Sequence, residues 1–351
     1  MRDPISFEHG PLKIGAAAAA NRKATETAIM IMQTGGNAVD AAIAAGHVMG
    51  VVEPLDCGLA AGGFMAIHCS SRNKTEVIDF LGTAPASAKY QLYAINDING
   101  DYTIRVEGQH NQIGFRSIAI PGTLRGFEEA HKKYGSLPMH ELIAPAISIA
   151  KEGFPISYKG ALRMARTAHI LATTDACRNL YLKSDNSAPR EGEIIQNKDY
   201  AYTLEEIAKY GADTFYSGDL ARFIVNEIDK NYGFLTKDDL LKYKAIWRKP
   251  SHFNYNGLDI LTPPPPSSGS LVFSGLEALT LDNKSHSAHQ LLAEAMLKMF
   301  SKRRRNFGDP AFTSTETVSE SPETTSLCTI DSGGNAACLT YSNNNHSGVV
   351  I

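Results

Sequence analysis

The sequence has no strong excess of charge of either sign and no long apolar run. Its 34 lysines and arginines are balanced by 37 aspartates and glutamates, which gives a net charge of −3 and no general attraction to polyanions. No stretch approaches the roughly 18 consecutive apolar residues of a membrane span, and the residues before Gly10 lack the apolar core of a secretory signal. We therefore expect no binding to nucleic acid or membranes, and a cytoplasmic location.

Cysteine is scarce and is not arranged for cross-linking or metal binding. The cysteines are odd in number and form no C-x-x-C pair, which argues against a disulfide framework and against a zinc site; they are Cys57, Cys69, Cys177, Cys328 and Cys338. The histidines include no H-E-x-x-H motif, and the glycine-rich stretch 58–63 has neither of the common phosphate-binding spacings. We expect a reduced protein without a metal or nucleotide cofactor.

The remaining composition is that of a soluble globular protein. Hydrophobic residues make up 43% and charged residues 20% of the 351 positions, which suits one large domain or two smaller ones. A small apolar run at 14–20 precedes two helical patterns separated by Gly35-Gly36, and Asn37 is placed to cap the second helix. Further expected elements are strands at 64–69, 76–81 and 258–261, helices within 123–171 and 204–243, two more up to about Arg305, and a polar surface loop at 173–202.

The strongest local pattern is a hairpin near the end of the sequence. Two β-type runs, 324–330 and 336–342, flank the turn sequence Asp331-Ser-Gly-Gly-Asn335. A three-residue loop closed by the Asp and Asn places Cys328 opposite Cys338. A disulfide between them is one interpretation, but in a reduced protein we expect two buried thiols.

The same register places Thr324 opposite Ser342, with Cβ atoms about 5 Å apart. A threonine hydroxyl is a weak nucleophile, but a threonine that begins a chain carries its own base, an α-amine that titrates near pH roughly 8. Cleavage of the Glu323–Thr324 bond would create this nucleophile and base together, and Ser342 would orient the threonine. From the hairpin alone, the alternative is that these hydroxyls are ordinary polar groups of a half-exposed strand.

A series of short motifs runs through the chain from about Ile14 to Asn344. The motifs are Gly35-Gly-Asn-Ala-Val-Asp-Ala-Ala42, Gly50-Val-Val-Glu-Pro54, Gly58-Leu-Ala-Ala-Gly-Gly-Phe64, Pro121-Gly-Thr123, Tyr134-Gly135, Pro145-Ala146, Gly153-Phe154, Gly211-Ala-Asp213, Pro264-Pro-Pro-Ser-Ser-Gly269, Gly308-Asp-Pro310 and Thr324-Thr325. In their order they resemble the γ-glutamyltransferases (γ-glutamyltranspeptidases), a family of N-terminal-nucleophile hydrolases.

The resemblance implies an α+β fold, the αββα sandwich, and a proenzyme that cleaves itself between Glu323 and Thr324. Mature Thr324 would take the γ-glutamyl group from glutathione or a similar amide as an ester and pass it to water or an amino acid. Ser342 matches the family's hydroxyl that orients the nucleophile. Asn344 matches its asparagine that contacts the substrate α-amine.

The resemblance divides the chain into two regions. Residues 1–323 resemble the large subunit, and residues 324–351 resemble only the start of the small subunit. The strands that complete one sheet, the serine pair that binds the substrate carboxylate and the oxyanion-hole glycines have no counterpart in this sequence. We therefore expect an incomplete sandwich and weak or no activity, unless a second polypeptide supplies the missing part.

One position departs from the family in a way that bears on the substrate. The family's arginine that grips the substrate α-carboxylate corresponds to Leu81, which has no group to bind a carboxylate. Arg105, Arg116 and Arg125 are candidate replacements. Because of Leu81, an acylase with a different acyl group is one alternative to a γ-glutamyl enzyme. A separate alternative is a non-catalytic protein or binding partner on the same scaffold.

Overall fold

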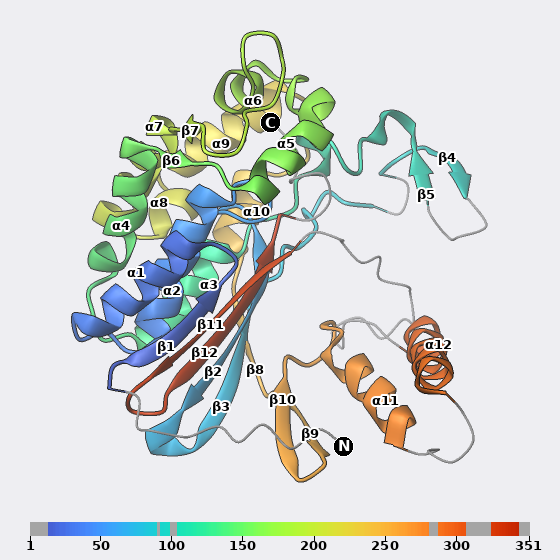
Figure 1. The fold of residues 1–351 in the computed structure, drawn as a ribbon. Helices are drawn as coiled ribbons and strands as arrows, with labels where there is room; N and C mark the ends of the chain where they lie inside the picture. Colours follow the sequence, from blue (N-terminus) through green and yellow to red (C-terminus); the bar gives the residue numbers. More distant parts are fainter. Residues whose placement is uncertain (1–12, 90–91, 99–103, 281–286, 307–323, 344–351) are drawn as a thin grey trace.

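The centre of the structure is a six-stranded antiparallel sheet (Figure 1). The computed structural model describes residues 13–89, 92–98, 104–280, 287–306 and 324–343. Within these residues the strand order is β1-β11-β12-β2-β3-β8. The strands are β1 Gly15–Ala19, β11 Thr325–Asp331, β12 Ala336–Ser342, β2 Gly62–Cys69, β3 Lys74–Asp79 and β8 Ile246–Arg248. The predicted terminal hairpin, β11–β12, therefore lies inside the sheet, between the strands β1 and β2.

Helices α1 (Arg22–Gln33) and α2 (Ala38–Val52) cover one face of this sheet, as Figure 1 shows. Helix α2 packs against β11 and β12 and also against α4 (Met139–Glu152), and every one of its residues is buried. Its small residues permit this close packing, since a Cβ on Gly46 would lie 2.7 Å from the ring of Phe127. The predicted apolar strand followed by two helices, with Asn37 capping the second, is confirmed.

The two faces of the central strands differ because successive side chains of a strand alternate between faces. Odd-numbered residues of the hairpin, such as Leu327, Leu339 and Tyr341, are buried on the side of α2. Even-numbered residues point the other way. Within the described part of the chain the side chains on this second face, which we call the open face, are exposed at Ser326, Cys328, Ile330, Cys338 and Thr340.

Helix α3 (Thr123–Tyr134) packs against α2, β2 and β3. The middle of the chain adds a group of helices beside the C-terminal end of α2 (Figure 1). They are α5 Tyr158–Leu171, α6 Asp175–Tyr181, α7 Lys198–Tyr210, α8 Asp213–Tyr216, α9 Asp219–Lys230 and α10 Lys237–Lys242, with the short strands β6 Phe154–Pro155 and β7 Ile194–Ile195. The prediction of a surface loop at 173–202 is right for residues 182–193, which form no helix or strand, and wrong for the rest. Thr174 and Asn197 cap α6 and α7, and Cys177 and Ile195 are buried there.

The remaining elements are two small hairpins and a helix pair. They are β4 Ile95–Ile98 with β5 Ile104–Val106, β9 Ser251–Tyr255 with β10 Leu258–Thr262, and α11 Gly269–Thr280 with α12 Ala288–Asn306. The rings of Phe253 and Phe273 stack with centroids 3.7 Å apart and join β9 to α11. The predicted strand at 258–261 and the two helices that follow it are confirmed.

Candidate active site

The hairpin has the register that the sequence predicts. Cys328 pairs with Cys338 and Thr325 pairs with Tyr341, so the next position places Thr324 opposite Ser342. On its other side, Ser342 pairs with Gly62 at the start of β2. The two candidate hydroxyls therefore lie at one end of the sheet, on neighbouring central strands.

The hydrogen-bond pattern of the hairpin decides how close these hydroxyls lie. The amide of Asp331 donates to the carbonyl of Asn335 at 3.0 Å, which makes this the first hydrogen-bonded pair. Hydrogen-bonded and non-hydrogen-bonded pairs alternate along an antiparallel ladder, so Thr324 and Ser342 form a non-hydrogen-bonded pair. In such pairs the Cα atoms are about 4.5 Å apart and the side chains are closer than at the other pairs.

The two adjacent threonines have opposite environments. Thr325 is only 3% exposed and its hydroxyl is buried without a hydrogen-bond partner among the described residues. Thr324 is exposed. By the alternation of the strand, its side chain belongs to the open face, together with that of Ser342. Of the two threonines, only Thr324 is accessible to a substrate.

The turn of the hairpin is fixed by one buried carboxylate, that of Asp331. Its Oδ1 accepts the amides of Gly333 at 2.9 Å and Asn335 at 3.0 Å, and its Oδ2 accepts the Asn335 side chain at 2.9 Å and the amide of Ala38 at 3.0 Å. Nearby, the Thr329 hydroxyl donates to the Ala38 carbonyl at 2.7 Å. These bonds tie the hairpin to the first turn of α2. Sequence reasoning placed Asp331 in the turn but did not find this role.

The far end of the hairpin is held by residues that the sequence did not single out. The Asn343 amide donates to the Asp56 carbonyl at 3.0 Å, and its Nδ2 donates to the Pro54 carbonyl at 3.1 Å. The buried carboxylate of Asp56 forms ion pairs with Lys159, at 2.6 Å, and with Arg163. These partners are far apart in the sequence, so no local pattern indicates them.

Two predicted site residues lie outside the part of the chain that the structure describes, and one further prediction about the hairpin is wrong. Asn344, the predicted contact of the substrate α-amine, and Glu323, the residue before the predicted cleavage, both lie outside the described residues. The prediction that Cys328 and Cys338 are buried thiols is wrong. Both are free cysteines and exposed, because their even-numbered positions fall on the open face.

Leu81 lies close to the end of the sheet where the two hydroxyls meet. Its amide donates to Asp79 Oδ1 at 3.0 Å, and the carboxylate of Asp79 also pairs with Arg248 at 2.6 Å. A Cβ on Gly62, the partner of Ser342, would lie 3.2 Å from the Leu81 Cα. The position that matches the family's arginine thus lies at the same end of the sheet as the candidate nucleophile, next to the strand that pairs with Ser342, but it carries an apolar side chain.

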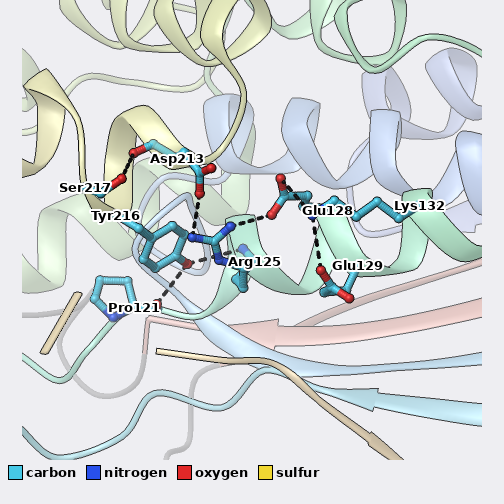
Figure 2. A network of polar contacts seen from close by, with 8 residues as sticks. All are labelled: Pro121, Arg125, Glu128, Glu129, Lys132, Asp213, Tyr216 and Ser217. Carbon is cyan, nitrogen blue, oxygen red and sulfur yellow. Dashed lines mark hydrogen bonds and ion pairs between the residues drawn. The ribbon is translucent and has the colours of Figure 1, made fainter. Parts of the chain in front are cut away.

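Arg125 is one of the three arginines that could replace the family's arginine, and Figure 2 shows that its guanidinium contacts other side chains of the protein. Its Nη1 lies 2.6 Å from Glu128 Oε2, its Nη2 lies 2.9 Å from Asp213 Oδ1, and its guanidinium lies 4.4 Å from the ring centroid of Tyr216. The Tyr216 hydroxyl donates to the Pro121 carbonyl at 3.0 Å. Arg125 therefore links α3 to α8 and is not available to a substrate.

Arg116 has a different environment. Its guanidinium lies 4.9 Å from the ring centroid of Phe234, and its buried Nε has no hydrogen-bond partner among the residues described. A β-bridge between Thr83 and Ile120 joins two segments of the chain. One follows Arg116, and the other follows Leu81, the position of the family's arginine. The side chain of Arg105 lies outside the described residues. Arg116 is thus the better candidate of the two arginines whose side chains are described.

No group of three or more histidine, cysteine, aspartate or glutamate side chains in the described ranges is arranged to hold a metal ion. None of the helices in the same ranges is long and apolar enough to cross a membrane.

Comparisons with known proteins identify the family of this chain. A family model described as Gamma-glutamyltranspeptidase matches residues 24–321. The glutathione hydrolase proenzyme of Escherichia coli (strain K12) is 32% identical over 308 residues, which cover 86% of this chain and 52% of that protein. The crystal structure of Helicobacter pylori gamma-glutamyltranspeptidase has a TM-score of 0.78 at 30% identity, covering 89% of this chain and 88% of that one.

An acylase is also among the similar structures. The cephalosporin acylase from Bacillus halodurans has a TM-score of 0.73 at 25% identity, and the alignment covers all of this chain and 71% of the acylase chain. These structures confirm the predicted α+β fold of the N-terminal-nucleophile hydrolases. The chain spans about half the length of the curated relatives that it matches. From the extent of the family match and the shared fold, the chain belongs to the gamma-glutamyltranspeptidase family.

Proposed function

We propose that the chain is part of a γ-glutamyl hydrolase or transferase in which Thr324 is the nucleophile, released by cleavage of the Glu323–Thr324 bond. The observation that carries this proposal is the opposite placement of the two adjacent threonines. Thr324 is exposed opposite Ser342, whereas Thr325 is buried on the side of α2. Membership of the family supports the same assignment.

The proposed self-cleavage uses only groups of the hairpin and water. Oγ of Thr324 attacks the carbonyl carbon of Glu323, and the peptide nitrogen leaves with a proton, so that an ester replaces the amide. Water then hydrolyses the ester. Glu323 is left with a carboxylate, and Thr324 regains its hydroxyl beside a free α-amine, which is the general base that the hydroxyl lacked.

In turnover, the α-amine accepts the hydroxyl proton while Oγ attacks the γ-carbonyl of glutathione or a similar amide. The proton passes to the departing amine, and the γ-glutamyl group remains as an ester on Thr324. Water or an amino acid then takes the group. A hydrogen bond from the Ser342 hydroxyl orients Oγ of Thr324 during both attacks. A non-hydrogen-bonded pair suits this role because its two side chains lie closer together.

Leu81 favours a second candidate function, which differs in the acyl group. Loss of a charge-assisted contact to the α-carboxylate costs about 1.5 to 3 kcal/mol, which is about one to two decades of affinity. An acylase whose acyl group lacks that carboxylate fits Leu81 better, and the similarity to a cephalosporin acylase supports it. If the Arg116 guanidinium binds the substrate α-carboxylate in place of the missing arginine, a γ-glutamyl group again fits the site.

The open face supports a further part of the proposal, that a second polypeptide packs on this sheet. Sheets stack about 10 Å apart through interdigitating side chains. Side chains such as Ser326, Cys328 and Thr340 are exposed here among the described residues and are small enough to interdigitate with a second sheet. This second sheet would bring further catalytic groups, in particular oxyanion donors, each typically contributing roughly 10² to 10³ in rate.

Self-cleavage is tested by denaturing electrophoresis and mass spectrometry of the chain produced with and without the second polypeptide. The expected product is a fragment that begins at Thr324. Thr324→Ala abolishes this fragment, Thr324→Ser retains it, and the matched control Ser326→Ala, an exposed hydroxyl on the same face, leaves it unchanged. A wild-type chain that stays whole in both preparations contradicts the proposal and favours the non-catalytic alternative.

The acyl group is tested with γ-glutamyl, glutaryl and butyryl anilides on the cleaved protein. Faster turnover of the γ-glutamyl anilide, lost on Arg116→Gln through a rise in KM of tenfold or more, supports the γ-glutamyl enzyme. Faster turnover of the butyryl anilide, unaffected by Arg116→Gln, supports the acylase. Arg166→Gln, on the helix α5, is a control for loss of a positive charge.

A further inference from the structure

A cavity of about 520 Å³ lies on the helical side of the molecule, at the end of strand β12. Its walls come from the C-terminal end of α2, the loop 57–60, the helices α6 to α9 and Asn343, the residue that follows Ser342. The volume falls within the roughly 300 to 1,000 Å³ typical of small-molecule sites. No part of the proposed acyl transfer uses this cavity.

The lining determines the charge of a suitable ligand. None of the lining residues is an aspartate, glutamate, lysine, arginine or histidine. Burying an unpaired charge in such a place is costly, so a γ-glutamyl compound with its ionised amine and carboxylate does not fit. Burial raises the pKa of the Cys57 thiol, the one thiol in the lining, so it stays protonated and is not a nucleophile.

Aromatic rings dominate the walls. Phe154, Phe215 and Phe223 line the cavity together with the rings of Tyr181 and Tyr200. Aromatic side chains pack favourably edge-to-face or offset against another ring, with centroids about 4.5 to 7 Å apart. The walls therefore favour a flat, uncharged ligand of one or two rings.

Two polar groups converge at one end of the cavity, above Gly58. A Cβ on Gly58 would lie 3.8 Å from the Tyr200 hydroxyl and 3.9 Å from Asn343 Oδ1, with no other atom within 4 Å. The Tyr200 hydroxyl accepts the Leu59 amide at 3.3 Å, and no described residue accepts its proton. Asn343 uses its Nδ2 on the Pro54 carbonyl, and none of the described residues donates to its Oδ1. One donor and one acceptor thus remain for a ligand.

We propose that this cavity is a binding site for a neutral aromatic alcohol of one or two rings. Its rings would pack against the phenylalanines, and its hydroxyl would accept from Tyr200 and donate to Asn343. A bound ligand would contact the residue next to Ser342, so the site lies directly behind the proposed active site without being part of it.

The proposal is tested by equilibrium dialysis of the full chain against 2-naphthol and against naphthalene, which has the same rings but no hydroxyl. We expect 2-naphthol to bind about tenfold more tightly than naphthalene, which corresponds to about 1.4 kcal/mol. Tyr200→Phe should reduce 2-naphthol binding to the level of naphthalene and leave naphthalene binding unchanged. Tyr202→Phe, at an exposed position of the same helix, is the matched control.

A second variant separates loss of the site from loss of the fold. Gly58→Ala places a methyl group at the polar end at ordinary contact distances, and Gly58 does not have a positive φ, so the chain should fold normally. We expect at least a tenfold loss of 2-naphthol affinity with an unchanged thermal unfolding midpoint. No binding of 2-naphthol by the wild-type chain, or equal binding by the wild-type, Tyr200→Phe and Gly58→Ala chains, overturns the proposal. These outcomes are independent of whether the chain cleaves itself before Thr324.

Discussion

His47 gives the molecule a pH dependence of stability that can be worked out from the structure. The residue lies within α2, is 3% exposed, and meets the ring of Phe127 edge-on with centroids 5.2 Å apart. Its Nδ1 has no hydrogen-bond partner among the described residues. Burial lowers the pKa of His47 from 6.5 to about 4, because the charged imidazolium would be poorly solvated there.

The sign of the effect follows from proton uptake. Between pH 6.5 and 4 the unfolded chain binds a proton at His47 that the folded chain does not, so the free energy of unfolding falls as the pH falls. The contribution of His47 to the free energy of unfolding is complete above pH 6.5 and is lost as the pH falls towards the folded pKa of about 4. One pKa unit corresponds to about 1.4 kcal/mol, so the loss is about 2 kcal/mol at pH 5 and about 3 kcal/mol below pH 4.

The assay is urea unfolding of the wild-type chain and of His47→Leu at pH 7.5 and pH 5, followed by the fluorescence of the single tryptophan, Trp247. Leucine keeps a similar volume but does not titrate. We expect the wild-type chain to lose about 2 kcal/mol more than the variant between these two pH values. Equal losses in the two chains would refute the assignment of this pH dependence to His47.

Three further substitutions test the packing around the hairpin. Asp331→Ala removes the acceptor of four hydrogen bonds and should lower the free energy of unfolding by about 3 kcal/mol or more in a urea titration, and a loss below about 1 kcal/mol would contradict its role in the turn. Tyr341→Phe removes a buried hydrogen bond of 2.6 Å to the Gly46 carbonyl and should cost about 1 kcal/mol, seen as a thermal midpoint lower by a few degrees. Gly126→Ala places a Cβ 2.3 Å from the Phe80 ring, so it should strongly reduce the soluble yield, and Phe80→Leu should partly restore it.

Much of the fold near the hairpin was predictable because the deciding interactions are local. Asn37 and the glycines before it mark the boundary between two helices in the sequence itself. The turn from Asp331 to Asn335 sets the pairing of Cys328 with Cys338 without reference to the rest of the chain. The opposition of Thr324 and Ser342 follows from the same turn.

What the sequence did not predict depends on contacts between distant segments. The stretch 173–202 is polar, yet parts of it form regular structure, because Cys177 in α6 and Ile195 in β7 find buried positions. The two cysteines of the hairpin are exposed because α2 covers the opposite face of their strands, which the register alone does not decide. The position of Leu81 beside Gly62, and the engagement of Arg125 with Asp213, likewise required the folded chain.

Successive side chains of β11 lie on opposite faces of the sheet, so the position along the strand decides which of the two adjacent threonines is exposed. Thr324 and Thr325 have the same chemistry, and a slip of one residue in the register of β11 would exchange their faces. The register is held seven positions away, where Asp331 bonds to the turn and to Ala38. One residue inserted between Thr325 and Asp331 would bury Thr324 and expose Thr325. The carboxylate at the turn therefore decides, from the other end of the strand, which of the two threonine hydroxyls lies on the open face.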